Sequence, residues 1–128
     1  MGLPLKIGIL SFRALDKRDS KNMITLRNAA QDLGHKVRVY RNANFQLAYM
    51  NGTRQLFYKN QKFTPPDVMI VRPGIAENVD MEVTIIKQLQ LMSVPVVNNY
   101  LPIVVAKNKV RTAQILQHEG IPLPRTVI

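Results

Sequence analysis

Residues 5–10, with the sequence LKIGIL, are the stretch that decides the fold. They form a near-continuous apolar run with β-branched side chains, typical of a strand buried on both faces in a parallel sheet. After a polar segment, Ser20 can cap a helix and Gly34 can end it in the left-handed conformation. Residues 36–40, KVRVY, follow as a second strand. Strand, helix and strand in this order predict a right-handed βαβ unit.

Further segments extend the pattern toward the carboxyl end. Residues 67–71 (DVMIV) and 94–97 (VPVV) are apolar enough for two more buried strands. In residues 45–59, large apolar side chains alternate with smaller or polar ones before Asn51-Gly52, a pair that favours a hairpin turn, and a partner strand follows the turn. The sequence therefore predicts an α/β fold with a short parallel sheet flanked by helices and an inserted β-hairpin.

Three helices are expected in the second half of the chain. Asn78 can cap the first, whose apolar face would hold Val79, Val83, Ile86 and Leu89. A short helix over 101–107 has Pro102 in its first turn. Asn108 can cap the last, with an inward face of Val110, Ala113 and Leu116. The apolar residues 121–128 are expected to form a strand, cut inside a longer protein.

Length and composition narrow the class of protein. The chain has 128 residues, 46% of them hydrophobic, which fits one folded domain. It has no cysteine, so disulfides and thiolate metal sites are excluded, in agreement with a reducing compartment. No apolar run approaches the roughly 20 residues of a membrane helix. We expect a soluble cytoplasmic domain.

The net charge of +10 is unevenly distributed along the chain. Residues 1–62 hold 12 basic and three acidic residues, a balance of +9, and the remainder carries +1. A field of this sign attracts nucleotides, nucleic acid or an acidic protein tail. For any single charge, a solvated surface position is the simpler explanation.

Most motifs for complete active sites are absent from this sequence. There is no Gly-x-Gly-x-x-Gly after the first strand and no Walker loop. His35 and His118 lie far apart in the sequence without a third nearby metal ligand, so structural roles are favoured. We therefore expect that this chain carries no complete active site.

Ligands of an open parallel sheet bind beyond the carboxyl ends of its strands. In this sequence those ends carry Ser11, Arg72 and Asn98. A guanidinium directly after a buried strand can clamp a carboxylate or phosphate with two parallel hydrogen bonds. Arg72 is thus a candidate anion ligand, and the equal alternative is a surface arginine paired with Glu77.

A second group of cations surrounds the start of the last expected helix: Lys107, Lys109 and Arg111. Cations at this end of a helix oppose its dipole, and a bound anion would offset that cost. Three solvated charges are the alternative.

Beyond these patterns, essentially the whole chain resembles the amino-terminal part of the RimK-type α-L-glutamate ligases, which are ATP-grasp carboxylate–amine ligases. The matching segments are KIGILS at 6–11, DVMIVRPG at 67–74, PVVNN at 95–99, AKNKVRTAQIL at 106–116 and EGIPLPRT at 119–126. In these ligases the last two segments join the first domain to the ATP-grasp domain. Asn108 stands where the family usually has Asp, which keeps a helix cap but removes a charge.

The resemblance implies a Rossmann-like pre-ATP-grasp domain over residues 1–106, then a linker helix and the start of an ATP-grasp domain over 107–128. The parent enzyme would use ATP and Mg²⁺ to make an acyl-phosphate and join it to an amine, forming ADP. Ribosome-modifying members add glutamates to a ribosomal protein tail. The regions that hold Mg²⁺ and most of the nucleotide would lie outside this chain, so no cofactor and no catalysis are expected for it alone.

For individual residues, position at the strand ends predicts substrate binding by Arg72, Asn98 and Ser11, and the resemblance implies roles for Arg72 in substrate binding and for Lys109 in ATP binding. Expected partners are the rest of the ligase and an acidic protein tail or small amino-acid substrate. Homo-oligomers are left open, and no membrane is expected. The competing hypothesis is a stand-alone basic module that binds nucleic acid or an acidic protein.

Overall fold

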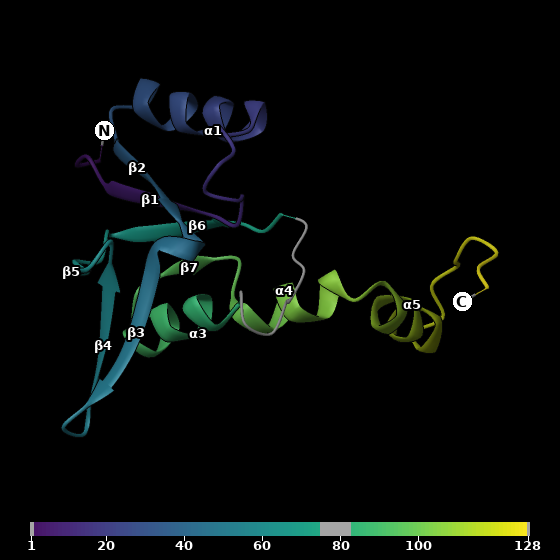
Figure 1. The fold of residues 1–128 in the computed structure, drawn as a ribbon. Helices are drawn as coiled ribbons and strands as arrows, with labels where there is room; N and C mark the ends of the chain where they lie inside the picture. The colour runs from purple at the N-terminus through teal and green to yellow at the C-terminus, as the bar shows by residue number, and fades with distance from the viewer. Residues whose placement is uncertain (1, 75–82, 128) are drawn as a thin grey trace.

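The central sheet has four parallel strands. The structure is a computed structural model that describes residues 2–74 and 83–127. The strand order is β2-β1-β6-β7, as Figure 1 shows. The strands are β1 (Lys6–Ser11), β2 (Lys36–Arg41), β6 (Val68–Arg72) and β7 (Val96–Val97). The predicted parallel sheet is confirmed, with strand ends displaced by only one or two residues.

Strand β1 lies between β2 and β6 and is parallel to both. Five of its six residues are buried, and Ile9 and Leu10 are fully enclosed. Its side chains alternate between the two faces of the sheet, and both faces are covered. This explains why its sequence is continuously apolar instead of alternating.

Helix α1 (Lys21–Asp32) covers one face of the sheet. The Ser20 hydroxyl accepts a hydrogen bond from the Met23 N–H at 3.2 Å, so the predicted cap is present. Met23 and Ala30 are the buried residues of this helix. Gly34 has a φ of +90°, as expected for the residue that ends a helix.

A small antiparallel sheet packs near the other face. It contains β3 (Phe45–Met50), β4 (Thr53–Tyr58) and β5 (Gln61–Lys62), and a short 3-10 turn, η1 (Asn42–Asn44), leads into it. Asn51 and Gly52 both have positive φ, so the predicted hairpin turn is confirmed. The two-residue β5 is too short for a sequence pattern to reveal. Aromatic rings pack together at the base of the hairpin and join the main core: Tyr40, Phe45, Tyr58 and Phe63.

The remaining helices are α3 (Thr84–Leu91), α4 (Tyr100–Lys107) and α5 (Lys109–His118). Val83, Ile86 and Leu89 are buried as predicted, whereas Asn78 and Val79 lie outside the described residues. The inward face predicted for α5 is wrong at Val110, which is exposed, because α5 packs mainly on α4 and projects away from the sheet.

Residues 121–127 form no strand, because they have no neighbouring strand to pair with in the described chain. None of the helices in the described ranges is both long enough and apolar enough to span a bilayer.

Gly8 marks a tight approach between the sheet and the segment before β6. A Cβ at this position would lie 2.7 Å from the Met69 sulfur and 3.0 Å from Pro66 Cγ. Met69 is fully buried and has little room to move. We expect Gly8→Val to lower the free energy of unfolding by about 1–3 kcal/mol.

Urea denaturation followed by circular dichroism measures this effect. Gly74→Ala is the control, since an added Cβ at Gly74 meets no atom of the described residues within 4 Å. Equal midpoints for Gly8→Val and the wild type would show that the packing around Gly8 is loose.

Candidate functional site

The carboxyl ends of three strands bring polar side chains into one row. Ser11 is the register partner of Arg41 on β2 and of Arg72 on β6. Register partners in a parallel sheet point to the same face. The three residues therefore share the face that α1 covers, at the edge where an open α/β sheet binds its ligands.

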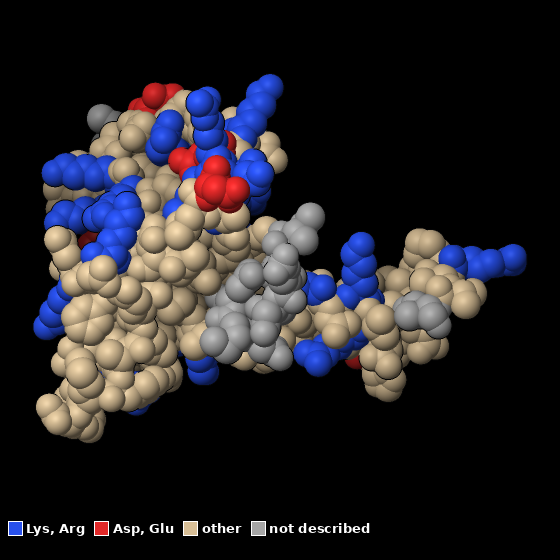
Figure 2. Space-filling view, in the orientation of Figure 1, with Lys and Arg blue, Asp and Glu red and all other residues tan. Residues whose placement is uncertain are grey.

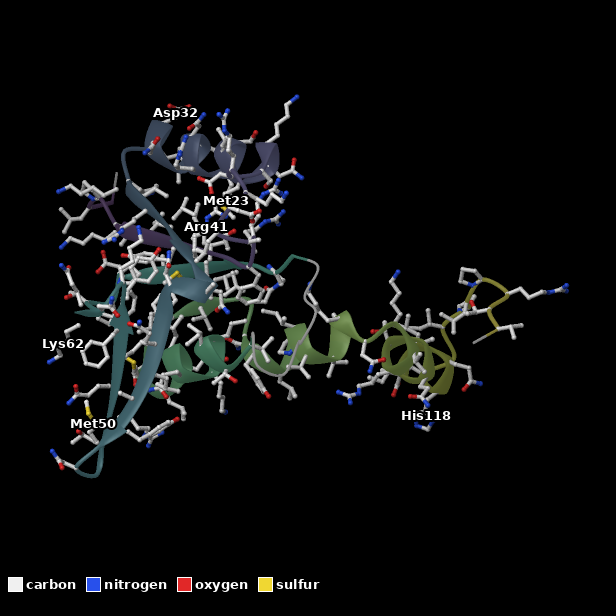
Figure 3. All side chains as sticks on the ribbon, viewed as in Figure 1. Met23, Asp32, Arg41, Met50, Lys62 and His118 are labelled. Carbon is white, nitrogen blue, oxygen red and sulfur yellow. The ribbon has the colours of Figure 1, made fainter. Side chains whose placement is uncertain are left out.

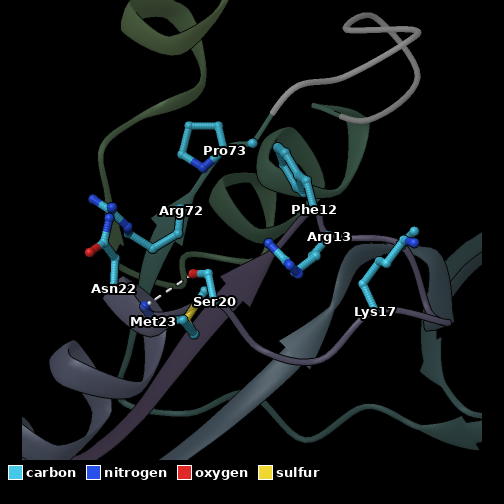
Figure 4. Close-up of a pocket in the computed structure, with 10 residues that line it drawn as sticks. Phe12, Arg13, Lys17, Ser20, Asn22, Met23, Arg72 and Pro73 are labelled. Carbon is cyan, nitrogen blue, oxygen red and sulfur yellow. Dashed lines mark hydrogen bonds between the residues drawn. The ribbon is translucent and has the colours of Figure 1, made fainter.

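A cavity of about 600 Å³ opens at this edge, between the loop after β1, the start of α1 and the end of β6. Figure 4 shows Arg72 reaching toward Asn22 at the start of α1, with Arg13 and Lys17 on the loop opposite. The described lining residues are Phe12, Arg13, Ala14, Lys17, Ser20, Asn22, Met23, Arg72, Pro73 and Gly74. Every charged residue among them is basic, so the cavity favours an anion.

The start of α1 adds to this positive character. The Ser20 hydroxyl occupies the Met23 N–H, while the N–H groups of Lys21 and Asn22 precede the first intrahelical bond. The helix itself therefore gives these two groups no acceptor. Together with the helix dipole they favour negative charge beside the three cationic side chains.

Ser11 lies at the predicted edge of the sheet, but its side chain is buried. It is 3% exposed, and its hydroxyl oxygen accepts a hydrogen bond from the Arg13 N–H at 3.2 Å. Ser11 is not among the described residues that line the cavity. In this structure it shapes the turn that carries Arg13, and its direct contact with a substrate stays a prediction.

Asn98 and Lys109 are not brought to the cavity either. Asn98 is exposed and follows β7, the outer strand of the sheet. Lys109 is exposed in the first turn of α5, where the Asn108 side chain caps the helix through the Arg111 N–H at 2.9 Å. Arg72 is the one predicted site residue that lines the cavity, and Glu77, its alternative partner, lies outside the described residues.

A lysine links the linker region to the cavity wall. The Lys107 ammonium at the end of α4 donates a hydrogen bond to the Gly74 carbonyl, in the turn that follows β6. Gly74 itself lines the cavity. The end of α4 is therefore in contact with the turn beside Arg72.

Sequence reasoning missed Arg13 and Lys17, which are two of the three cations among the described residues that line the cavity. Two features of the sequence indicated them. The loop that carries them follows the carboxyl end of the first strand, and the first half of the chain holds most of the positive charge. The loop is polar and contains no motif, so the sequence alone did not single out any residue within it.

The described residues do not form a metal site. No cluster of three His, Asp or Glu side chains able to hold a metal occurs in the described part of the chain. Asp19 is bound to Arg41, and the Asp67 carboxylate accepts from the Lys6 N–H at 2.7 Å. These residues therefore do not fit a Mg²⁺ centre. His35 has a structural role, as expected, because its Nδ1 accepts from the Leu5 N–H at 3.1 Å.

Comparison with known proteins places these features in a family. The family model described as the RimK PreATP-grasp domain matches residues 5–103. A "Probable alpha-L-glutamate ligase" from Maridesulfovibrio salexigens is 34% identical to the chain, and one from Aliivibrio salmonicida is 30% identical. Each match covers 95% of this chain and 39% of the relative, so the chain spans well under half the length of these curated relatives. The chain belongs to the RimK pre-ATP-grasp domain family.

Proposed function

We propose that this chain is the amino-terminal domain of an ATP-dependent carboxylate–amine ligase of the glutamate ligase type, and that it forms one wall of the substrate and nucleotide site. One observation carries the proposal: a cavity whose described charged residues are all basic lies at the carboxyl edge of the parallel sheet, with Arg72 on it. Family membership supplies the class of reaction, and the cavity supplies a place for its anions.

The proposed reaction has two steps. A carboxylate oxygen attacks the γ-phosphorus of ATP, which forms an acyl-phosphate and releases ADP. An amine nitrogen then attacks the acyl carbon, which forms the amide and releases phosphate and a proton. In this scheme Arg72 binds the substrate carboxylate or the transferring phosphoryl group, and Arg13 and Lys17 add positive charge around it.

The proposal assigns residues 1–106 to the pre-ATP-grasp domain and residues 107–128 to the linker and the start of the ATP-grasp domain. Lys109 is assigned to the ATP phosphates, since an ammonium on the linker helix can neutralise phosphate charge. Asn98 and Ser11 are assigned to the substrate. Mg²⁺ would be held by residues of the ATP-grasp domain, outside this chain. A cytoplasmic location is part of the proposal, and the absence of cysteine agrees with it.

ADP release tests this division of labour. The 128-residue chain alone should show background ATP turnover, whereas a longer protein in which the chain precedes an ATP-grasp domain should release ADP when glutamate and an acceptor peptide are present. Chelation of divalent cations should abolish release in the longer protein. Chelator-sensitive ADP release by the pure 128-residue chain would contradict the proposal.

A different surface favours a second candidate function. In this alternative the chain is a basic module that binds an acidic protein or nucleic acid. Lys6 and Lys36 are register partners at the start of β1 and β2, and Arg38 lies 4.9 Å above the Tyr40 ring. With Pro66 they line a cleft of about 250 Å³. Figure 2 shows Lys and Arg side chains gathered on this side of the molecule, at left.

Binding of poly-glutamate or a single-stranded oligonucleotide, measured against salt concentration, distinguishes the two functions. Salt-sensitive binding that Lys36→Gln weakens, together with no ligase activity in the longer protein, would favour the binding module. The described aromatic rings beside this cleft, Tyr40 and Tyr58, are buried and packed together, which disfavours base stacking.

A further inference from the structure

We infer that the ion pair between Arg41 and Asp19 is a positioning device that fixes the loop carrying Arg13 and Lys17 into the cavity. The inference rests on the proposed function, because it concerns how the same cavity is built. Arg41 is not itself among the described residues that line the cavity. It would act through the loop, without contact with the ligand.

The Arg41 guanidinium makes an unusual number of contacts with this one loop. Its Nη2 donates to Asp19 Oδ1 at 2.7 Å and to the Lys17 carbonyl at 2.9 Å. Its Nη1 donates to the Ala14 carbonyl at 3.1 Å and to the Arg13 carbonyl at 3.4 Å. Three carbonyls and one carboxylate, spread over the loop from Arg13 to Asp19, thus converge on a single side chain.

Besides the Arg13 N–H to Ser11 hydroxyl bond at 3.2 Å, the loop has few other restraints. Residues 12–19 contain no helix or strand, and the Lys17 N–H to Ala14 carbonyl bond at 3.0 Å is a local turn. The guanidinium of Arg41 can satisfy several carbonyls at once because its donors are held in a rigid planar fork. A lysine at this position has one compact donor group and could not reproduce the arrangement.

Arg41 is anchored in the sheet, and the ion pair with Asp19 is largely buried. Arg41 is the last residue of β2, and its backbone N–H donates to the Tyr58 hydroxyl at 3.0 Å. The side chains of Arg41 and Asp19 are only 16% and 24% exposed. A charge-assisted pair with this degree of burial is better ordered than a surface pair. Figure 3 shows Arg41 beneath α1, near Met23.

The hydrogen bonds from Arg41 reach the main chain of residues that line the cavity. The three carbonyls that Arg41 binds belong to Arg13, Ala14 and Lys17, and all three residues line the cavity. Their main chain is held from one side, so Arg41 does not occupy the cationic side chains of Arg13 and Lys17. The Lys17 ammonium lies 3.9 Å from Asp16 Oδ2, and both side chains of this pair are exposed, so a bound anion can compete with it. Loss of Arg41 should therefore disperse these two cations while leaving the sheet intact.

The test measures binding of inorganic phosphate to the 128-residue chain by backbone amide shifts in NMR. Arg41→Gln, Arg41→Lys and Asp19→Asn are compared with the wild type. Arg54→Gln is the matched control, since it removes an exposed arginine charge on β4 and Arg54 is not among the described residues that line the cavity. Amide dispersion of β1 and α1 reports whether each variant is folded.

We expect the wild type to show phosphate-dependent shifts at Arg13, Lys17 and Arg72. Arg41→Gln and Asp19→Asn should weaken binding about tenfold, the value of one charge-assisted hydrogen bond. Arg41→Lys should not restore it, and Arg54→Gln should bind like the wild type. Faster exchange of the loop amides in the Arg41 variants should accompany the loss.

Three results would overturn the inference, and they differ in whether the proposed function is overturned with it. Wild-type affinity in folded Arg41→Gln and Asp19→Asn would show that the pair does not position the cavity, and the proposed function would stand. Absence of phosphate shifts at the cavity in the wild type would overturn the proposed function and this inference together. An equal loss in Arg54→Gln would reduce the effect to net charge and would also overturn the inference.

Discussion

Arg72→Ala in a full-length ligase is expected to lower kcat/KM for the carboxylate substrate about 10- to 150-fold. The range follows from a charge-assisted hydrogen bond of about 1.5–3 kcal/mol and about 1.4 kcal/mol per decade. Arg72 ends β6 and lines the cavity, and it has no ion pair with another described residue. The arginine is exposed, so its removal should cost substrate binding more than stability.

Steady-state kinetics with varied carboxylate substrate measure this loss. Arg54→Ala is the matched control, because Arg54 is an exposed arginine on β4 in the projecting hairpin. Arg72→Lys should recover only part of the loss, since an ammonium cannot form two parallel hydrogen bonds. Unchanged kinetics in Arg72→Ala would make Arg72 an ordinary surface residue.

Lys109→Met in the same protein is expected to weaken ATP binding about tenfold or more. An ammonium that contacts a phosphate contributes a charge-assisted hydrogen bond, and methionine keeps the length of the side chain without its charge. Lys109 is exposed in the first turn of α5 and has no role in the Asn108 cap, so folding should be unaffected. ATP affinity is measured by calorimetry, with circular dichroism as the folding control.

The structure changes the choice of control for this experiment. Lys107 is bound to the Gly74 carbonyl, so Lys107→Met should disturb the turn beside Arg72 and is unsuitable as a neutral comparison. Arg111→Met removes a neighbouring exposed charge from the same helix. Equal ATP affinity in Lys109→Met and the wild type would remove Lys109 from the nucleotide site, and an equal loss in Arg111→Met would indicate a general field effect.

The parts of the fold that could be predicted are those set by local pattern. The apolar run at residues 6–11 predicts a central strand because both of its faces are buried. Ser20 and Asn108 predict helix starts because each side chain caps its own helix. The orientation of α5 could not be predicted, because an amphipathic pattern does not tell which neighbour is available to cover the apolar face.

The site could be predicted only in part, for a related reason. Arg72 follows a buried strand, and its position at the ligand edge is a property of parallel sheets. The contact between Arg41 and Asp19 spans 22 residues of sequence and depends on how the loop after β1 folds back over β2. Ser11 occupies the predicted edge, but its hydroxyl is engaged by the Arg13 N–H, which a strand pattern alone cannot reveal.

The most direct test of the central proposal follows the oxygen atoms of the carboxylate substrate. A full-length ligase containing this domain is given ATP, free glutamate as the amine and an oligoglutamate peptide with ¹⁸O in its carboxylates, and the released phosphate is analysed by mass spectrometry. Attack of a carboxylate oxygen on the γ-phosphorus predicts ADP and one ¹⁸O atom in the phosphate per amide formed, at a rate that Arg72→Ala lowers. Phosphate without ¹⁸O, or AMP and pyrophosphate as products, would contradict the assignment of this domain to an acyl-phosphate-forming ligase.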